Sequence, residues 1–459
     1  MDRAGFVSQD TGIMASFRQA RDALTQHRSR HRSQSHAQAH EEQHGEDAPR
    51  LEHPLVSRTP PELVATQDEL ASLLKHLREQ GRFAFDSEFI GETSYHPQLC
   101  LVQIATSSRI AIVDPMLPID LLPFWQLVCD PDIEKIVHAG EQDLEPAWRH
   151  VGQRPANVFD TQVAAGFAAM AYPVSLAKLI QEVLGVTLTK GLTFTQWDAR
   201  PLTPRQLRYA ADDVRYLPAV HDSLLSTLRD CGRLAWALDE CESRCDPERW
   251  TVHVEDDSRR IRGAGTLDGR QMSVLQALFG WREALAREQN LPPRALMKDE
   301  VLIDMARRPP KTLEKLRDVR GLPRPVVNSF ADTLLTLMQQ AWNEPVPVLP
   351  RAPEFSPRER FAADALFALL QATCGSAGID PALVCTRQEL TDLLGARRQG
   401  QPIDDYPVMR GWRRQVVGES LLKALSGEPL GPFPSPMRDA TRQPTTDRPR
   451  RGTTDHRRI

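Results

Sequence analysis

The spacing of apolar and polar positions predicts that a folded domain begins near residue 58. Residues 66–81 have the period of an amphipathic helix, with Thr66 as N-cap and Glu69 completing a capping box. Gly81 follows the last helical residue, a place where glycine commonly ends a helix. Three short β-rich runs separated by turn-like segments come next, and they favour an antiparallel three-stranded meander. These runs are residues 82–91, 98–106 and 109–114.

The rest of this domain alternates between strand and helix. Residues 135–140 form a short apolar run typical of a buried strand, which continues into a predicted helix at 140–152. Further helical patterns occur at 160–170, 175–185 and 203–230. A helix, three strands and then alternating strands and helices indicate an α/β domain that ends near residue 235.

The length and composition of the chain indicate several domains. Hydrophobic residues make up 41% of the 459 residues and charged residues 26%, as in globular proteins. The predicted segments are a disordered low-complexity arm (1–52), the α/β domain (53–239), a charged linker (240–264), an all-helical domain (265–342), a Pro-rich linker (343–355), a second helical domain (356–427) and a disordered basic tail (428–459).

The cysteines and the hydropathy bear on where the protein works. The seven cysteines are odd in number and contain no CxxC pair, which favours reduced thiols over disulfides or a structural zinc. Cys241 and Cys245 lie one helical turn apart and are interpreted as packing residues. We expect a cytoplasmic protein, because no stretch has the length of a membrane span and the N-terminus lacks a signal peptide's apolar segment. The net charge of −4 does not by itself indicate a nucleic-acid partner.

Asp86 and Glu88 are the first candidate catalytic residues. One residue separates them in a predicted strand, so their side chains point to the same face. Phe83, Phe85 and Phe89 are expected on the other face. Two adjacent carboxylates repel each other unless a cation or a proton is shared, and a hard divalent metal ion is a natural partner. The alternative is an edge strand with solvated acids.

Asp143 and His138 lie where the strand at 135–140 gives way to a helix. Asp143 falls in the first turns of that helix, where the helix dipole favours an acid in any protein. His138 ends the apolar strand, and a hydrogen-bonded structural histidine is favoured over a catalytic one. Neither residue indicates an active site on its own.

Tyr209 and Asp213 belong to the predicted helix that Thr203 opens, with Gln206 completing a capping box. They are four residues apart and share one helical face, so a phenol and a carboxylate can project into one site. Asp212 points about 100° away around the helix. The alternative is a core aromatic residue beside a surface acid.

Taken in order, these elements resemble the motifs of the DEDD 3′-5′ exonuclease superfamily, and within it the DEDDy branch and ribonuclease D. The motifs are DSEFIGETSYHPQLCLVQIAT (86–106), HAGEQDLE (138–145) and LTPRQLRYAADDVRYL (202–217), with further similarity in VFDTQVAAGF and WDARPL. The resemblance implies an RNase H-like fold, a mixed sheet flanked by helices. It also implies that two Mg²⁺ or Mn²⁺ ions are bound and that Tyr209 orients the attacking water. The implied metal ligands are Asp86, Glu88, Asp143 and Asp213.

The chemistry of phosphodiester hydrolysis agrees with this resemblance. Two hard ions can polarise a phosphodiester, generate hydroxide from bound water and stabilise the leaving 3′-oxygen. By analogy, Asp86 bridges the ions and Asp143 supports one of them. With an ordinary pKa of about 10, Tyr209 suits an orienting role better than that of a base. The loop at 188–202 has Thr-Gln-Trp-Asp where the family commonly has a Gln-Ser-Asp-Trp-like run, which bears on substrate contacts more than on metal binding.

Residues 267–327 resemble an HRDC domain, a helical module also attached to RecQ-type helicases. The resemblance rests on the WRE helix, the NLPPRALMKDEVL stretch and the closing RGLP turn. Positive charge in its second half suits a surface that follows phosphates, with a solvated helix face as an equal alternative. The basic residues are Lys298, Arg307, Arg308, Lys311, Lys315, Arg317, Arg320 and Arg324. Residues 356–427, with DYPVMRGWRRQVVGESLL, resemble the second helical domain of ribonuclease D.

The sequence therefore predicts a three-domain, metal-dependent 3′-to-5′ exoribonuclease that releases nucleoside monophosphates. The resemblance implies RNA with a free 3′ end as the partner, precursor tRNA in particular, and we favour a monomer. Two alternatives stay open: an exonuclease acting mainly on DNA and, more distantly, a nucleic-acid-binding adaptor without catalysis. The complete set of acids argues against the adaptor.

Overall fold

The computed structural model describes residues 52–91, 93–188, 196–345 and 356–426, which form two compact units. One unit contains the α/β domain and the first helical domain. The other contains the C-terminal helices together with the short segment Ala165–Pro173. The predicted N-terminal arm, except for Glu52, and the predicted basic tail lie outside the described residues. Within the described ranges, no helix is both long and apolar enough to cross a membrane.

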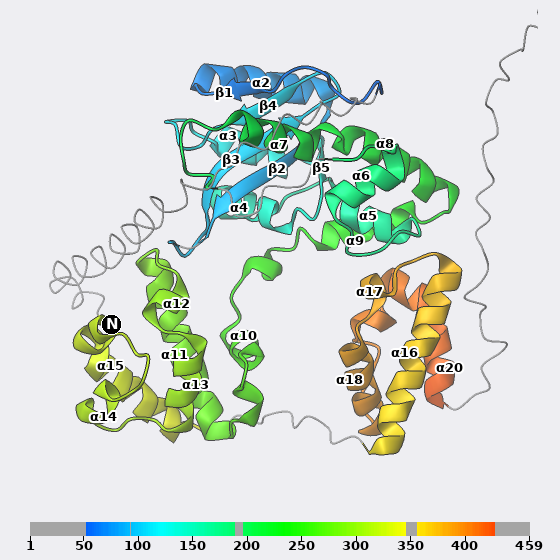
Figure 1. The fold of residues 1–459 in the computed structure, drawn as a ribbon. Coiled ribbons are helices and arrows are strands. Elements are labelled where there is room, and N and C mark those ends of the chain that lie inside the picture. The colour runs from blue at the N-terminus through cyan, green and yellow to red at the C-terminus, as the bar shows by residue number, and fades with distance from the viewer. Residues whose placement is uncertain (1–51, 92, 189–195, 346–355, 427–459) are drawn as a thin grey trace, which may run out of the picture. The chain divides into compact units, whose positions relative to one another are not determined.

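The α/β domain is built on a six-stranded mixed sheet with the order β1-β4-β3-β2-β5-β6 (Figure 1). The strands are β1 (Glu62–Val64), β2 (Arg82–Ile90), β3 (Gln98–Ala105), β4 (Ile110–Val113), β5 (Glu134–Val137) and β6 (Val158–Asp160). β2, β3 and β4 pair antiparallel, which confirms the predicted meander. β1 pairs parallel with β4, while β5 and β6 extend the other side of the sheet in parallel. The predicted fold, a mixed sheet flanked by helices, is confirmed.

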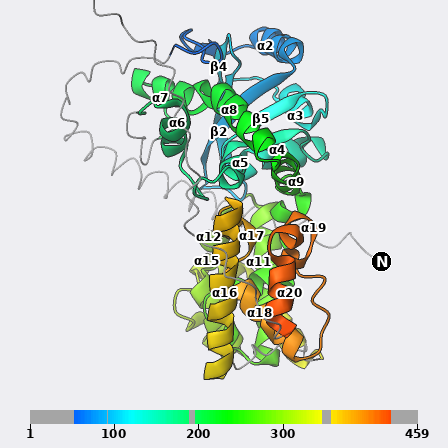
Figure 2. The ribbon, with the colours of Figure 1, turned by 90° about the vertical axis from the view of Figure 1, so that its right-hand side faces the viewer.

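Helices cover both faces of this sheet. The helices are α2 (Gln67–Gln80), α3 (Leu122–Cys129), α4 (Glu141–Val151), α5 (Thr161–Phe167), α6 (Leu176–Leu184), α7 (Pro204–Arg215), α8 (Leu217–Asp230) and α9 (Leu234–Ser243). α2, α3 and α4 pack with Phe83 and Phe85 of β2 in one apolar cluster. α7 and α8 pack on the opposite face, over Ala84 and Ala105. Figure 2 shows α8 lying across this second face.

Local sequence signals place the ends of α2 correctly. The Thr66 hydroxyl accepts a hydrogen bond from the Glu69 backbone N–H, and the Glu69 carboxylate accepts one from the Thr66 N–H. Gly81 ends the helix in the left-handed conformation, with φ 69°. Each of these contacts satisfies a backbone group that the helix itself leaves unpaired, so the helix ends follow from short-range chemistry.

The helical run at 203–230 is two helices rather than one. α7 begins with the predicted capping box at Thr203 and Gln206. It ends at Tyr216, and α8 starts at Leu217 with Pro218 in its first turn. Proline has no N–H to donate to the preceding turn, so a continuous helix cannot pass this point without losing a hydrogen bond.

β2 keeps the predicted alternation only as far as the candidate acids. Phe83 and Phe85 are buried in the core, but Phe89 is half-buried and is not part of that cluster. The pairing register between β2 and β3 shifts between Glu88 and Phe89, where one residue of β3 is left over. Such a bulge bends the end of a strand, which explains why Phe89 does not join the core.

The first helical domain is formed by residues from the second half of the same unit. Its helices are α10 (Val254–Arg260), α11 (Gly269–Glu288), α12 (Pro293–Leu296), α13 (Asp299–Arg307), α14 (Leu313–Arg317) and α15 (Arg324–Asn343). Arg282, from the predicted WRE helix, is buried and donates hydrogen bonds to the Met297 carbonyl at 3.0 Å and the Asp299 carboxylate at 2.7 Å. Arg282 therefore ties α11 to the start of α13.

The segment at 240–264, predicted as a linker, is folded. It contains the end of α9, a 3-10 turn (Pro247–Trp250) and α10. Trp250 packs against the α/β core, whereas Ile261 packs against the core of the helical domain. Cys241 and Cys245 are buried free thiols, as predicted for packing residues.

The second unit is helical apart from its connections. Its main helices are α16 (Pro357–Ala377), α17 (Pro381–Val384), α18 (Arg387–Arg398) and α20 (Glu419–Ser426), with short turns α19 (Gly411–Arg413) and η4 (Arg414–Gly418) before α20. Trp412 is buried against Phe167, with the ring centroids 4.7 Å apart. The Asp380 N–H donates to the Gly166 carbonyl at 2.9 Å. The end of α5 is therefore part of this helical core.

Candidate active site

Three candidate acids meet on one face of the sheet. Asp86 and Glu88 alternate with Phe83 and Phe85 along β2, so they point to the face that α7 covers. Asp213 lies on α7 and faces the same space. One carboxylate oxygen from each of Asp86, Glu88 and Asp213 lies within 4.8 Å of the other two. Two elements that are distant in sequence thus place three half-buried carboxylates together.

Tyr209 shares a cavity of about 180 Å³ with two of these acids. The cavity is lined by Asp86, His138, Leu176, Tyr209, Asp213 and Leu217. The Tyr209 ring lies 6.0 Å from the buried ring of Trp197. Trp197 belongs to the loop that departs from the family pattern, and here it contacts the predicted water-orienting residue. Residues 189–195 of that loop lie outside the described residues.

The position of Trp197 is secured by Arg200. The Arg200 guanidinium donates to both carboxylate oxygens of Asp114, at 2.6 and 2.7 Å, and to the carbonyls of Cys100 and Trp197. A bidentate arginine–carboxylate pair fixes orientation as well as distance. The described part of this loop is therefore anchored to the sheet behind Tyr209.

Asp143 is buried in the first turn of α4 and is not one of the three converging carboxylates. Its pKa is raised well above the ordinary value, first by burial and then by the negative charge of Asp86. The two acids are therefore close enough to influence each other. Asp143 lies at the margin of the same acidic site.

Asp160 organises the turn that leads into α4, and the sequence analysis did not select it. Its carboxylate accepts hydrogen bonds from the N–H groups of Ala139, Gly140 and Gln162, at 3.0, 3.1 and 2.8 Å. Ala139 has φ 56°, a conformation that needs support in a residue other than glycine. The VFD run at the start of the family-like segment was the available signal. Asp160 thus positions the backbone from which Asp143 projects.

We predict that Asp160→Ala lowers the free energy of unfolding by about 3 kcal/mol, because it leaves buried N–H groups without an acceptor. Asp160→Asn keeps one acceptor oxygen and is the matched control, with an expected loss of about 1 kcal/mol. Urea unfolding of both variants measures these values. Equal stability of the alanine variant and the wild type would contradict the role given to Asp160.

The electrostatics of the acidic site reflect uncompensated negative charge. Burial raises the pKa of Asp86 to about 6. Burial and the neighbouring charge of Asp86 raise the pKa of Glu88 to about 8, and burial with both neighbours raises that of Asp213 to about 9. In the described part of the chain, none of these carboxylates forms an ion pair with a basic side chain. Such a cluster is stabilised by a cation or by protons.

The residues present fit a divalent metal ion. Carboxylate oxygens are the ligands that Mg²⁺ prefers, and Mn²⁺ also accepts them. Gln103 gives a second indication, because it lies opposite Asp86 on β3 and is fully buried. Neither amide atom of Gln103 has a hydrogen-bond partner among the described residues. Buried polar groups are rarely left unpaired, and the hydration shell of an ion beside Asp86 would provide partners.

His138 has partners for both ring nitrogens. Nδ1 lies 3.0 Å from the Thr161 hydroxyl, and Nε2 lies 3.0 Å from the Val174 carbonyl. Burial lowers the pKa of the imidazole. These contacts agree with the favoured interpretation of a structural histidine, although the ring also forms part of the cavity wall.

Known proteins share both the sequence and the arrangement described above. Residues 61–229 match the 3′-5′ exonuclease family, and residues 271–338 match the HRDC domain. Ribonuclease D of Gluconacetobacter diazotrophicus is 35% identical over 375 residues, which cover 81% of this chain and 94% of that protein. Ribonuclease D of Escherichia coli K12 is 34% identical over 373 residues, covering 80% and 99% of the two chains.

Solved structures agree with these sequence matches. The crystal structure of Escherichia coli RNase D, described as an exoribonuclease involved in structured RNA processing, superposes with a TM-score of 0.71 at 33% identity. The match covers 81% of this chain and 100% of that one. A protein from Bifidobacterium adolescentis has a TM-score of 0.60 at 22% identity, a likeness that concerns the fold alone.

Proposed function

Because this chain belongs to the ribonuclease D family, we propose that Asp86, Glu88, Asp143 and Asp213 form its metal-dependent hydrolytic site. The chain is a 3′-5′ exoribonuclease with an HRDC domain. The observation that carries the residue assignment is the convergence of Asp86, Glu88 and Asp213 within 4.8 Å.

The four acids would hold the ions in unequal ways. Enzymes of this superfamily use divalent metals, and we propose two Mg²⁺ or Mn²⁺ ions here. Asp86 lies between its neighbours on the strand and the helix, which suits a bridging ligand, and Asp143 supports the site from α4. When bound, such ions activate the nucleophile and stabilise charge on the phosphate and the leaving oxygen.

Tyr209 is proposed to orient the attacking water. Burial, and then the charge of Asp213, raise the pKa of the phenol above its ordinary value, so it stays protonated at neutral pH. It can therefore hold water by hydrogen bonding but cannot act as a base. The water oxygen attacks the terminal phosphorus, the bond to the 3′-oxygen breaks, and that oxygen takes a proton. A nucleoside 5′-monophosphate leaves.

We propose RNA with a free 3′ end as the substrate, and the 3′ trailers of precursor tRNA as one form of it. The support is the similarity to the Escherichia coli enzyme, which acts in structured RNA processing. A monomer that works in the cytoplasm agrees with the absence of any sequence signal for secretion or assembly.

The test uses purified full-length protein with Mg²⁺ or Mn²⁺ and 5′-labelled single strands of RNA and DNA of one sequence. We expect RNA to shorten stepwise from its 3′ end with release of nucleoside 5′-monophosphates, and we expect EDTA to stop the reaction. Faster shortening of DNA would select the DNA alternative. No shortening of either strand would overturn the catalytic assignment.

Gln103 provides a test that does not depend on activity. Gln103→Leu removes a buried amide that has no partner, so the metal-free protein should be as stable as the wild type or more stable. We expect its affinity for Mn²⁺ to fall about 10-fold or more, as when groups around a metal site are removed. Calorimetric titration with Mn²⁺ measures this. Unchanged Mn²⁺ affinity would mean that Gln103 does not contact the hydrated ion.

A further inference from the structure

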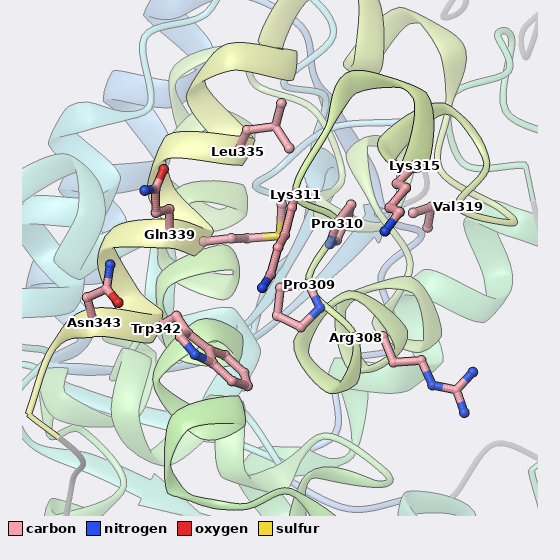
Figure 3. A pocket seen from close by; sticks show the side chains of 11 residues that line it. Arg308, Pro309, Pro310, Lys311, Lys315, Val319, Leu335, Gln339, Trp342 and Asn343 are labelled. Carbon is pink, nitrogen blue, oxygen red and sulfur yellow. The ribbon is translucent and has the colours of Figure 1, made fainter.

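A second cavity lies in the HRDC domain, apart from the catalytic residues. Its volume is about 580 Å³. It is bounded by the loop between α13 and α14, by α14 itself and by the last turns of α15 (Figure 3). The lining residues are Arg308, Pro309, Pro310, Lys311, Lys315, Val319, Leu335, Met338, Gln339, Trp342 and Asn343. This volume falls within the usual range for small-ligand sites, roughly 300–1,000 Å³.

One wall of this cavity is apolar. Leu335, Met338 and Trp342 follow one another on a single face of α15, at the spacing of successive helical turns. Trp342 is half-buried and packs at the edge of the domain core. Figure 3 shows its ring beside Pro309, with the polar side chains of Gln339 and Asn343 along the same helix. The cavity thus offers a flat aromatic surface bordered by hydrogen-bonding groups.

The opposite side of the cavity is positively charged. Lys311 and Lys315 are exposed, and Figure 3 draws the Lys311 side chain between α15 and Lys315. Arg308 extends away from them at the edge. The described lining contains no acidic residue, and none of these three cations forms an ion pair within the described ranges. The surface therefore has a positive potential that no neighbouring carboxylate neutralises.

We propose that this cavity binds one unpaired nucleotide of the RNA substrate, with the base against Trp342 and the flanking phosphates at Lys311 and Lys315. An aromatic ring that stacks a base, next to cations that follow the backbone, is the combination by which proteins hold single-stranded nucleic acid. An acidic peptide could satisfy the lysines but has no equivalent for the aromatic wall. The proposal rests on the proposed function and names a binding site for the RNA outside the catalytic domain.

The test compares full-length variants in EDTA, where RNA is bound but not cut. The dissociation constant is measured for an RNA hairpin with a single-stranded 3′ tail and for the same hairpin with a blunt end. For the wild type we expect the tail to increase affinity. Trp342→Leu should reduce this tail-dependent gain roughly tenfold, because stacking of the base is lost, whereas Trp342→Phe should retain most of it.

The lysines are tested by Lys311→Glu/Lys315→Glu, which changes exposed residues and should leave the melting temperature unchanged. The matched control is Arg317→Glu/Arg320→Glu, which reverses two exposed charges of the same domain that do not line the cavity. We expect the lysine variant to lose tail-dependent affinity and its salt dependence to weaken by about one unit of slope per lost phosphate contact. The control should weaken both hairpins equally and keep the gain from the tail.

Hydrolysis of a dinucleotide, which has no tail to place in the cavity, separates the two proposals. If the wild type and the cavity variants cleave it at equal rates while the tail-dependent affinity falls, both proposals stand. Cleavage with an unchanged gain from the tail in Trp342→Leu would overturn the cavity proposal alone, as would equal losses for tailed and blunt RNA in the lysine variant. Absence of any RNA cleavage by the wild type would overturn the proposed function.

Discussion

Replacing Asp213 by asparagine is expected to lower kcat for RNA hydrolysis about 10³-fold while the protein stays folded. The amide withdraws one negative ligand from the cluster of Asp86, Glu88 and Asp213. Metal-assisted charge stabilisation contributes several kcal/mol, and each ~1.4 kcal/mol changes a rate tenfold. Single-turnover cleavage of end-labelled RNA under saturating Mg²⁺ measures the loss.

The adjacent residue on the same helix supplies the matched control. Asp212 forms an ion pair with Arg215 at 3.1 Å and is not one of the converging carboxylates. Asp212→Asn should therefore keep the wild-type kcat. Asp213→Asn should also raise the melting temperature of the metal-free protein, because a neutral amide replaces a buried acid among like charges. Equal loss of activity in both variants would show that α7, rather than one carboxylate, had been disturbed.

The metal-free protein is expected to become less stable as the pH rises from about 5 to about 9. The folded-state pKa values are about 6 for Asp86, 8 for Glu88 and 9 for Asp213, each above the ordinary value of its residue type. Between the ordinary and the raised values, the folded state binds more protons than the unfolded state, so stability falls as the pH increases. Thermal unfolding in EDTA over this range measures the trend. A rise in stability across the same window would contradict it.

Divalent metal should reverse this loss, most strongly at high pH. Ligand at about 100 times its dissociation constant stabilises a folded protein by about 2.7 kcal/mol. For a domain of this size the melting temperature should then rise by roughly 5 °C or more. We expect a large shift with Mn²⁺ at pH 8 and a small one at pH 5, where protons compete with the metal. Asp213→Asn should show a reduced shift at pH 8, which links the effect to this site.

Short-range patterns were sufficient to predict much of the architecture. The capping boxes at Thr66 and Thr203 form as predicted, because each involves hydrogen bonds between residues three apart. The strand at 82–90 places Asp86 and Glu88 on one face, because side chains alternate along any strand. The spacing of Tyr209 and Asp213 likewise follows from the helical period. Such features depend on neighbours in the sequence, and the sequence specifies them.

Features that depend on distant partners required the tertiary structure. No local pattern indicates that Gln103 lies opposite Asp86 or that Asp160 holds the turn before α4, because both contacts join separate strands or turns. The break at Tyr216 and the bulge after Glu88 also went unpredicted, since a proline position and a pairing register decide them. The cavity at Trp342 is a further case, because it forms only where α14 and α15 are brought together.

The acidic site combines both kinds of information. Sequence alone determined which acids are present, which of them share a face and which family they resemble. Only the fold decided that Asp86, Glu88 and Asp213 meet within 4.8 Å, that Asp143 is buried at the margin, and that no basic side chain among the described residues neutralises the three. The physical reason is that charge repulsion and burial depend on distances through space, which are set when α7 packs on the sheet.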